Sequence, residues 1–196
     1  LPVITSNDTD VDGTVDASTV DLDPGVAGRQ TAVSTAQGSW SVDASANLSY
    51  TPTGNFNGTA TIKYTVADNA GGVSNSATIT VTVTPVNDAP TAVDDSASTF
   101  EDTPVSLPDI TSNDTDVDGS IDKTTVDLDP VAPGQQQTVS DIHGTWTVTS
   151  SAVLSFTPVI GFDGTVTRTY TVKDNLGAVS NTATITIVVN LILDAP

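Results

Sequence analysis

Residues 77–84 read ATITVTVT, an uninterrupted alternation of apolar and hydroxyl-bearing side chains. A period of two places the apolar side chains on one face of a β-strand and the threonines on the other. The run ATITIVVN at residues 183–190 has the same pattern. Both runs predict strands with one face on a core and one face in water, and no window of the chain offers the apolar stripe of a helix.

The two runs belong to an internal repeat. An offset of 106 residues aligns residues 1–90 with residues 107–196 without a gap, and it pairs Trp40 with Trp146. The sequence therefore predicts two domains, residues 1–90 and residues 91–196, of which the first lacks the counterpart of residues 91–106. We expect the chain to be a segment of a longer array of such repeats.

Each repeat carries the signals of several short strands. In the first repeat these strands are expected near residues 19–23, 31–35, 39–43 and 47–51, before a long hairpin whose turn is DNAGG at residues 68–72. About seven strands at this spacing favour a two-sheet sandwich. The prediction is an all-β protein of two tandem immunoglobulin-like Greek-key β-sandwich domains arranged end to end.

The few aromatic side chains are expected to face inward. Trp40 and Trp146 each lie in a Gly-x-Trp-x-Val strand, where a large ring normally fills the core, although a sugar-stacking platform is the alternative. Phe56 and Phe162 are likewise expected to point inward and to fill the end of each sandwich.

Composition excludes several classes of partner. The chain has 24 acidic and 5 basic residues and a net charge of −19, which repels nucleic acid and anionic membrane surfaces. It has no cysteine, and no apolar run approaches the roughly 20 residues of a membrane-spanning helix. We therefore expect no nucleic acid partner and no membrane insertion. Without disulfides, the stability of the fold must depend on packed cores or on bound ions.

The motif NDTDVDG occurs twice, at residues 7–13 and 113–119, and these stretches are named the acidic loops. Carboxylates that crowded repel one another unless a cation lies among them, and hard oxygen ligands followed by a glycine suit Ca²⁺. Threonine stands where a helical calcium hand would place its closing glutamate, so that fold is not supported. The alternative is a solvated acidic turn. The candidate ligands in the loops are Asp8, Asp10, Asp12, Asp114, Asp116 and Asp118.

Further oxygen ligands are expected from neighbouring loops at the same end of a sandwich. The hairpin turn beside the acidic loop carries Asp68 in the first repeat and Asp174 in the second. The linker between the repeats, PVNDAP at residues 85–90, brings Asn87 and Asp88 to this end of the second repeat.

These motifs resemble those of the cadherin-like repeats found in large calcium-dependent surface adhesins of bacteria. The resemblance covers essentially the whole chain, which would make the two sandwiches cadherin-like. It is carried by the acidic loop TDVDG at 115–119, the linker VNDAP at 86–90, the turn VADNAG at 66–71 and the strand FEDTP at 100–104.

The resemblance implies calcium between the two domains. Its ligands would be Asn87, Asp88, Asp116, Asp118 and Asp174. Glu101 would serve a junction below the second domain. In the linker after that domain LIL at 191–193 replaces PVN, which removes the asparagine and leaves only Asp194. The Asp-Arg-Glu ligand motif of animal cadherins is missing, so three ions per junction are not expected.

The leading functional hypothesis is a calcium-stiffened extender (stalk) segment of a large bacterial cell-surface adhesin, secreted and without enzymatic activity. Its partners would be neighbouring repeats of the same polypeptide, with a cell-surface or matrix ligand bound through other regions. The alternatives are a carbohydrate- or protein-binding module and a self-assembling filament subunit that exchanges strands. The lone histidine, His143, precedes a glycine in an expected surface turn and predicts no catalytic triad.

Overall fold

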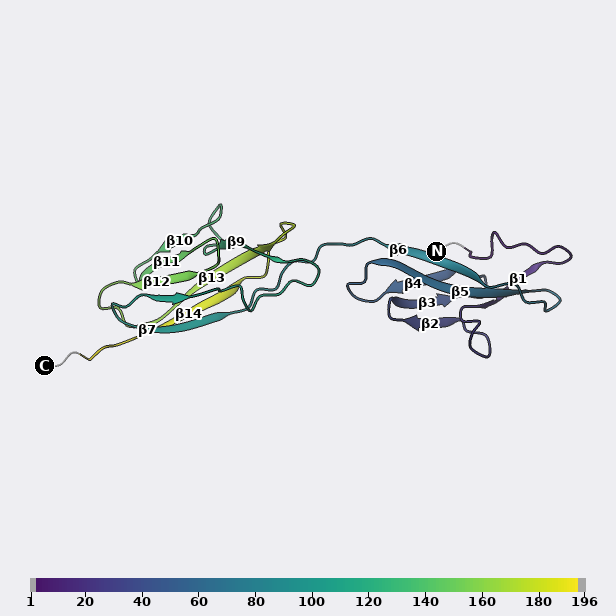
Figure 1. Cartoon of the computed structure of the whole chain (residues 1–196), viewed down its shortest axis with the longest axis horizontal. Helices are drawn as coiled ribbons and strands as arrows, with labels where there is room; N and C mark the ends of the chain where they lie inside the picture. Colours follow the sequence, from purple (N-terminus) through teal and green to yellow (C-terminus); the bar gives the residue numbers. More distant parts are fainter. Residues whose placement is uncertain (1–2, 194–196) are drawn as a thin grey trace. The chain divides into compact units, whose positions relative to one another are not determined.

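The computed structural model describes residues 3–193, in which the secondary structure consists of β-strands. The chain divides into two compact units, one that ends at Val86 and one that begins at Asn87. They are named unit 1 and unit 2, and their strands are labelled in Figure 1. Because unit 2 begins at Asn87, residues 87–90 of the linker belong to it. Between residues 3 and 193 there is no helix that could span a membrane.

Unit 1 consists of two three-stranded sheets, with the strand orders β1-β5-β6 and β2-β3-β4. Every strand pairing within these sheets is antiparallel. The predicted long hairpin is formed by β5 and β6. The strands are β1 (Val15–Asp21), β2 (Ala32–Thr35), β3 (Gly38–Val42), β4 (Leu48–Pro52), β5 (Gly58–Asp68) and β6 (Ala77–Val83).

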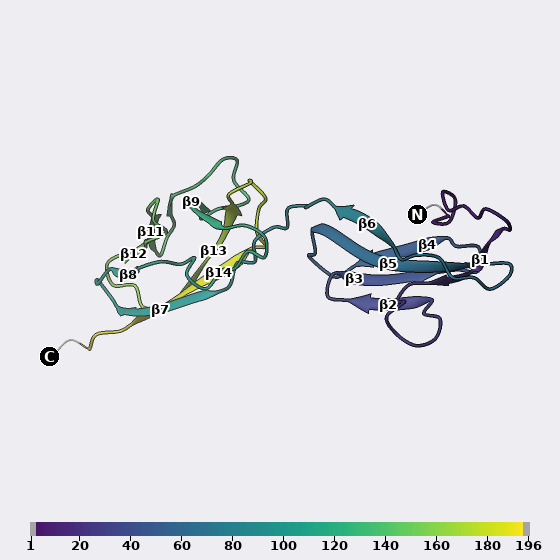
Figure 2. The same cartoon turned by 45° about the vertical axis from the view of Figure 1, so that its right-hand side comes forward.

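Unit 2 repeats this architecture and adds one strand to each sheet. Its sheets have the orders β7-β14-β13-β9 and β10-β11-β12-β8, and β7 runs parallel to β14 (Figure 1 and Figure 2). The strands are β7 (Asp95–Phe100), β8 (Val105–Leu107), β9 (Ile121–Asp127), β10 (Thr138–Ser140), β11 (Gly144–Val148), β12 (Leu154–Pro158), β13 (Gly164–Asp174) and β14 (Ala183–Asn190).

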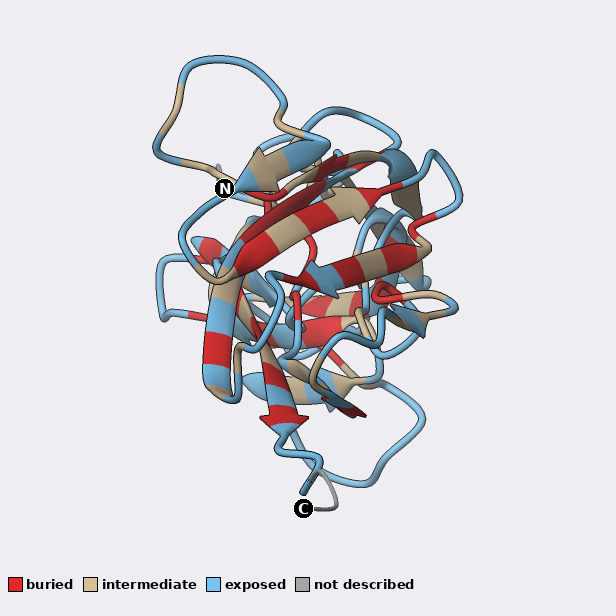
Figure 3. Ribbon diagram, turned by 90° about the vertical axis from the view of Figure 1, so that its left-hand side faces the viewer, coloured by how far each residue is buried: buried red, intermediate tan, exposed pale blue. Residues whose placement is uncertain are grey.

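A tryptophan lies at the centre of each core, as the sequence predicted. Trp40 and Trp146 are buried, and each ring packs on the aromatic residue opposite it, Tyr50 or Phe156, with ring centroids 4.2 and 4.4 Å apart. Buried and exposed positions alternate along the strands, as the bands in Figure 3 show. The half-buried Phe56 and Phe162 pack against these cores.

The first strand begins earlier than the sequence predicted, at Val15 and not near residue 19. The reason is an irregularity in its pairing with β5 between Asp16 and Asp21. The Asp16 carboxylate accepts hydrogen bonds from the backbone N–H and the hydroxyl of Ser18, at 3.0 and 2.6 Å. This local turn breaks the alternation of side chains, so the period of two is lost before residue 19.

The units differ at the edges of their sheets. In unit 2 the stretch of residues 87–100, named the edge segment, ends in β7 and covers β14, where Ile185 and Ile187 are fully buried. The counterparts of these residues on β6 of unit 1, Ile79 and Val81, are only half-buried. Among the described residues, β6 is therefore an edge strand with a partly exposed apolar face.

We expect unit 2 to be the more stable unit, because it buries apolar surface that unit 1 leaves accessible. The polypeptides 1–86 and 87–196 should be unfolded by heat separately, in EDTA and at equal concentration. The expected midpoint for 87–196 is higher by about 5 °C or more. Equal midpoints, or a higher midpoint for 1–86, would contradict this expectation.

Candidate metal site

In both units the acidic loop is held against the turn of the long hairpin. Asn175 in that turn accepts a hydrogen bond from the backbone N–H of Ser120 at 2.9 Å, and its own N–H donates to the Ser120 carbonyl at 2.9 Å. Asn69 and Thr14 form the same pair in unit 1, at 2.9 and 3.0 Å. The predicted proximity of loop and turn is therefore confirmed.

Only a glycine fits at the last position of the acidic loop, because neighbouring oxygen atoms leave no room for a side chain. A Cβ atom at Gly119 would lie 2.6 Å from Oδ2 of Asp116 and 2.7 Å from Oδ1 of Asn175. Gly13 has the same surroundings, formed by Asp10 and Asn69. A side chain at either position would push a carboxylate out of the cluster of oxygens.

Asp174 connects the hairpin turn to the linker. It is buried, and its Oδ1 accepts hydrogen bonds from the backbone N–H groups of Leu176 and Ala178 at 2.8 and 2.9 Å. Its Oδ2 accepts a hydrogen bond from Nδ2 of Asn87 at 2.6 Å. Burial acts to raise the pKa of Asp174, but these hydrogen bonds outweigh it and lower the pKa below its ordinary value. The carboxylate is therefore ionised at neutral pH.

Asp88, which follows Asn87 in the linker, contacts the acidic loop of unit 2. The backbone N–H of Asp88 lies 3.3 Å from both carboxylate oxygens of Asp118, and the N–H of Asp118 lies 3.4 Å from Oδ1 of Asp116. Within unit 2 the side chain of Asn87 thus contacts Asp174, and the backbone of Asp88 contacts Asp118 beside Asp116. The family resemblance implied that these five residues share one site, which stays a prediction.

Two oxygen atoms in this cluster are buried without a hydrogen-bond donor. They are Oδ2 of Asp116 and Oδ1 of Asn87, and Oδ2 of Asp10 has the same status in unit 1. A buried acceptor without a partner costs about 1–3 kcal/mol. A cation bound next to these oxygens would remove that cost.

Within residues 3–193 no three acidic or histidine side chains are grouped closely enough to form a metal cage on their own. Calcium does not require one, because it takes six to eight oxygen ligands from carboxylates, amide and backbone carbonyls, and water. The buried oxygens of Asp116 and Asn87 without a donor are of the type that such a mixed ligand set uses.

The first aspartate of each acidic loop, which the sequence predicts as a ligand, accepts hydrogen bonds from a tyrosine of the sheet. Asp114 accepts from the hydroxyl of Tyr170 at 3.0 Å and from the N–H of Val93 at 2.8 Å, and Asp8 accepts from Tyr64 at 3.0 Å. Burial, together with Asp8, raises the pKa of Tyr64 to about 12, so its hydroxyl remains a donor. These carboxylates anchor the loop to the sheet.

The remaining predicted ligands have other surroundings within their own units. Asp12 is exposed, and Asp68 accepts hydrogen bonds from the N–H groups of its own turn, at Ala70 and Gly72. Glu101 follows β7 and accepts a hydrogen bond from the N–H of Ile192 at 2.6 Å, beside the end of β14. Asp194 lies outside the described residues.

Sequence reasoning missed three polar side chains that build the surroundings of the site. They are the tyrosine that anchors the loop, the asparagine in the hairpin turn and an asparagine before β14 that binds the edge segment. A signal was present, because each is identical in the two repeats. The pairs are Tyr64 and Tyr170, Asn69 and Asn175, and Asn75 and Asn181.

His143 occupies the surface turn that the sequence predicted. Its side chain is 43% exposed, and its Nδ1 lies 3.6 Å from the carboxylate of Asp141. The same carboxylate binds Arg168 at 2.6 Å. This group is a local ion pair of unit 2 that has no counterpart in unit 1, where Gln37 and Thr35 replace His143 and Asp141.

Comparison with known proteins identifies relatives of the chain. The family model described as "Bacterial cadherin-like domain" matches residues 2–85 and 87–191. A search of curated protein sequences found no match.

Solved structures with a similar fold include chicken VE-cadherin EC1-2, with 20% identity and a TM-score of 0.39 over 73% of this chain and 72% of that one. Drosophila N-cadherin EC1-4 has 17% identity and a TM-score of 0.48, over 82% of this chain and 40% of that one. An endo-fucoidan hydrolase of glycoside hydrolase family 107 has 19% identity and a TM-score of 0.34, over 89% and 24%. All three similarities are weak.

Asp95 at the start of β7 has an unusual environment. Burial is the main factor that raises its pKa to about 6, and the carboxylates of Asp114 and Asp94 add to it, whereas a hydrogen bond from Asn113 acts in the opposite direction. Its Oδ2 is buried without a donor. Because the folded-state pKa lies above the ordinary value of 3.8, unit 2 loses stability as the pH rises from that value to about 6, and the loss is complete above about pH 6.

Asp95→Asn should therefore stabilise unit 2 at pH 7.5 by about 1–2 kcal/mol and change little at pH 4, where the native carboxyl is already protonated. Urea unfolding in EDTA at the two pH values measures the difference. Asp163→Asn, at an exposed position, is the control and should be neutral at both. A gain of equal size at pH 4 and pH 7.5 would show that ionisation is not the cause.

Proposed function

The chain belongs to the family of bacterial cadherin-like domains, and we propose that it is a calcium-stiffened extender (stalk) segment of a large bacterial cell-surface adhesin. This membership confirms the resemblance that the sequence motifs indicated. Cadherin-like domains suggest an adhesion-type extracellular repeat, and they are typically non-enzymatic. The stalk role, the calcium and the bacterial surface are the specific parts of the proposal.

The observation that supports it best is the binding of the linker to unit 2. Val86 is the last residue of unit 1, and the next two residues contact Asp174 and Asp118 of unit 2. A cation held by Asn87, Asp88, Asp116 and Asp118 would fix the direction in which the chain enters unit 2. Calcium would in this way restrict bending at the linker.

The charge of the chain supports a site that fills outside a cell. With a net charge of −19, the chain repels itself wherever carboxylates converge, and a divalent cation relieves that repulsion. Extracellular calcium modules bind in the range of about 10⁻⁴ to 10⁻³ M. The proposed partners are neighbouring repeats of the same polypeptide, and the adhesion target would bind other regions of the parent protein.

Calcium titration of the whole chain by calorimetry should show saturable binding at millimolar concentration. Asp116→Asn should weaken this binding at least about tenfold, because it removes charge next to the buried oxygen without a donor. Asp163→Asn removes the same charge at an exposed turn and should leave the affinity unchanged. Absence of binding to the wild-type chain, or equal loss in both variants, would contradict a site in the acidic loop.

Stiffening can be measured separately, because the chain has no cysteine. Spin labels at the exposed positions Ser45 and Ser151, which are counterparts in the two units, can be introduced as Ser45→Cys and Ser151→Cys. Millimolar calcium should narrow the distribution of distances between the labels, and Asp116→Asn should abolish the narrowing. A distribution that calcium leaves unchanged while it binds would refute the stalk mechanism but not the site.

A further inference from the structure

A cavity of about 380 Å³, named the outer pocket, lies on the outer face of unit 2, where β9 pairs with β13. On the sheet side it is lined by Thr171 and by Asp127, which stands opposite Thr171 in the pairing. The loop of residues 128–137, between β9 and β10, lines the other side with Pro130 and Ala132. Because this loop lies over Thr171, the residue is only 9% exposed although its side chain points away from the core.

Hydrogen bonds hold the loop of residues 128–137 in place. Nε2 of Gln135 donates to the backbone carbonyls of Thr124 and Val126 in β9, at 2.6 and 3.0 Å. Oδ1 of Asp127 accepts from two backbone N–H groups of the loop, both at 3.0 Å. The outer pocket is therefore preformed, so a ligand would lose little affinity to ordering of the loop.

The polar groups of the outer pocket differ in what they offer a ligand. Lys173 contributes an exposed ammonium, which only donates hydrogen bonds and takes part in no ion pair within residues 3–193. Asp127 contributes a carboxylate, which only accepts. The hydroxyls of Thr125 and Thr171 do both. The outer pocket thus has one positive and one negative side chain.

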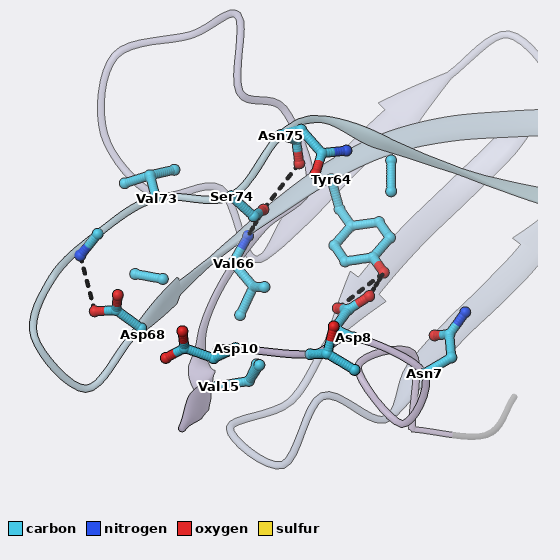
Figure 4. A pocket seen from close by; sticks show the side chains of 14 residues that line it. Asn7, Asp8, Asp10, Val15, Tyr64, Val66, Asp68, Val73, Ser74 and Asn75 are labelled. Carbon is cyan, nitrogen blue, oxygen red and sulfur yellow. Dashed lines mark hydrogen bonds between the residues drawn. The ribbon is translucent and has the colours of Figure 1, made fainter. Parts of the chain in front are cut away.

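This balance of charge distinguishes the outer pocket from the pocket beside the acidic loop of unit 1, which has a volume of about 420 Å³. Figure 4 shows Asp8, Asp10 and Asp68 along that pocket, and no basic side chain is among the described residues that line it. The outer pocket favours a ligand without net charge instead. An anion would also be repelled by the net charge of −19 of the chain.

Hydroxyl groups on a ligand would satisfy all of these side chains. A sugar hydroxyl can accept from the ammonium of Lys173, donate to the carboxylate of Asp127 and exchange hydrogen bonds with a threonine. A small apolar surface, formed by Pro130, Ala132 and Val179, remains for the carbon atoms of the ring. The outer pocket therefore suits one unit of a neutral sugar.

Hydroxyl side chains continue from the outer pocket along the same face of the sheet. They come from three neighbouring strands, β13, β14 and β7, whose pairing places them side by side. From Thr171 to Thr165 the row on β13 extends about 20 Å, at about 3.3 Å per residue. This length can hold several sugar units, whereas a single small molecule would need only the pocket. The residues, named the hydroxyl face, are Thr165, Thr167, Thr169, Thr184, Thr186, Ser96 and Ser98.

We propose that unit 2 binds a neutral glycan chain, with one sugar unit in the outer pocket and the following units on the hydroxyl face. The proposal adds a ligand to unit 2, and it depends neither on the stalk role nor on bound calcium. No aromatic residue is among the described residues that line the outer pocket. Ring stacking would therefore contribute nothing there, and the expected dissociation constant is on the order of 1 mM.

Unit 1 has the same framework but different side chains at two of these positions. Arg29 stands at the position of Gln135, and Ala67 replaces Lys173. A larger cation from the loop thus takes the place of the amide, and the ammonium from the strand is missing. These natural replacements supply test variants, because the fold of unit 1 already accommodates them.

The test is the titration of the whole isotope-labelled chain, in EDTA, with four neutral hexasaccharides, followed by NMR. The probes are maltohexaose and the β-linked hexasaccharides of glucose, mannose and galactose. At least one of them should shift the backbone amide signals of Gly134, Thr171 and Lys173 saturably. The signals of unit 1 should stay unchanged.

Variants of the outer pocket locate the site. Gln135→Arg and Lys173→Ala each introduce the residue of unit 1 and should weaken binding about tenfold or more. Lys63→Ala removes an exposed lysine of unit 1 and should have no effect. The spectra of the variants away from the changed residue would verify that they remain folded.

A variant of the hydroxyl face tests whether a chain of sugars is bound. Thr169→Lys introduces the residue that unit 1 has at this position, Lys63. It places a long charged side chain on the hydroxyl face, outside the outer pocket. Hexasaccharide binding should become about tenfold weaker, whereas shifts caused by the monosaccharide of the same sugar should stay unchanged.

Any of four results would overturn the proposal. The first is the absence of saturable shifts with every hexasaccharide, and the second is an affinity that Gln135→Arg leaves unchanged. The third is a hexasaccharide affinity that Thr169→Lys leaves unchanged. The fourth is tighter binding of free serine or of polygalacturonate than of every neutral hexasaccharide, which would make a zwitterion or a polyanion the ligand.

Discussion

The acidic loop of each unit depends on one buried tyrosine hydroxyl. In unit 2 the Tyr170 hydroxyl lies within 3.2 Å of the Asp114 carboxylate, the Ile110 carbonyl and the Val93 carbonyl. Burial, with the nearby carboxylates, raises the pKa of Tyr170 far above its ordinary value. The hydroxyl therefore keeps its proton and joins strand β13, the acidic loop and the edge segment. The geometry of the proposed calcium site follows from this joint, because it fixes where the rest of the loop begins.

Two carboxylates of unit 2 show how local contacts decide ionisation in so acidic a chain. Asp174 is buried but receives hydrogen bonds from its own turn and from Asn87, which lower its pKa. Asp95 is half-buried beside other carboxylates, and its pKa rises. Hydrogen bonds stabilise the anion of Asp174, whereas the surroundings of Asp95 destabilise its anion at neutral pH. Charge count alone, which is the same for both residues, does not distinguish them.

Much of the fold could be predicted because periodicity reports directly on burial. The alternation at residues 77–84 predicted β6, and the Gly-x-Trp-x-Val motif placed Trp40 and Trp146 in the cores. The acidic loop and the linker could be assigned to one site because the repeat and the resemblance to known repeats agreed. The roles of Asp8 and Asp114 could not be predicted, since they depend on a tyrosine 56 residues away in sequence. The start of β1 at Val15 could not be predicted either, because the Asp16–Ser18 turn interrupts the alternation of apolar and polar residues.

The parallel pairing of β7 and β14 has a mechanical consequence. The chain enters unit 2 just before β7 and leaves just after β14, so a pull on the two ends draws these strands past each other in opposite directions. The load falls along the strands, and the backbone hydrogen bonds across their six paired residues share it in shear. They would have to fail together, whereas bonds at the end of an antiparallel hairpin open one after another. A unit whose first and last strands pair in this way is therefore suited to bear tension.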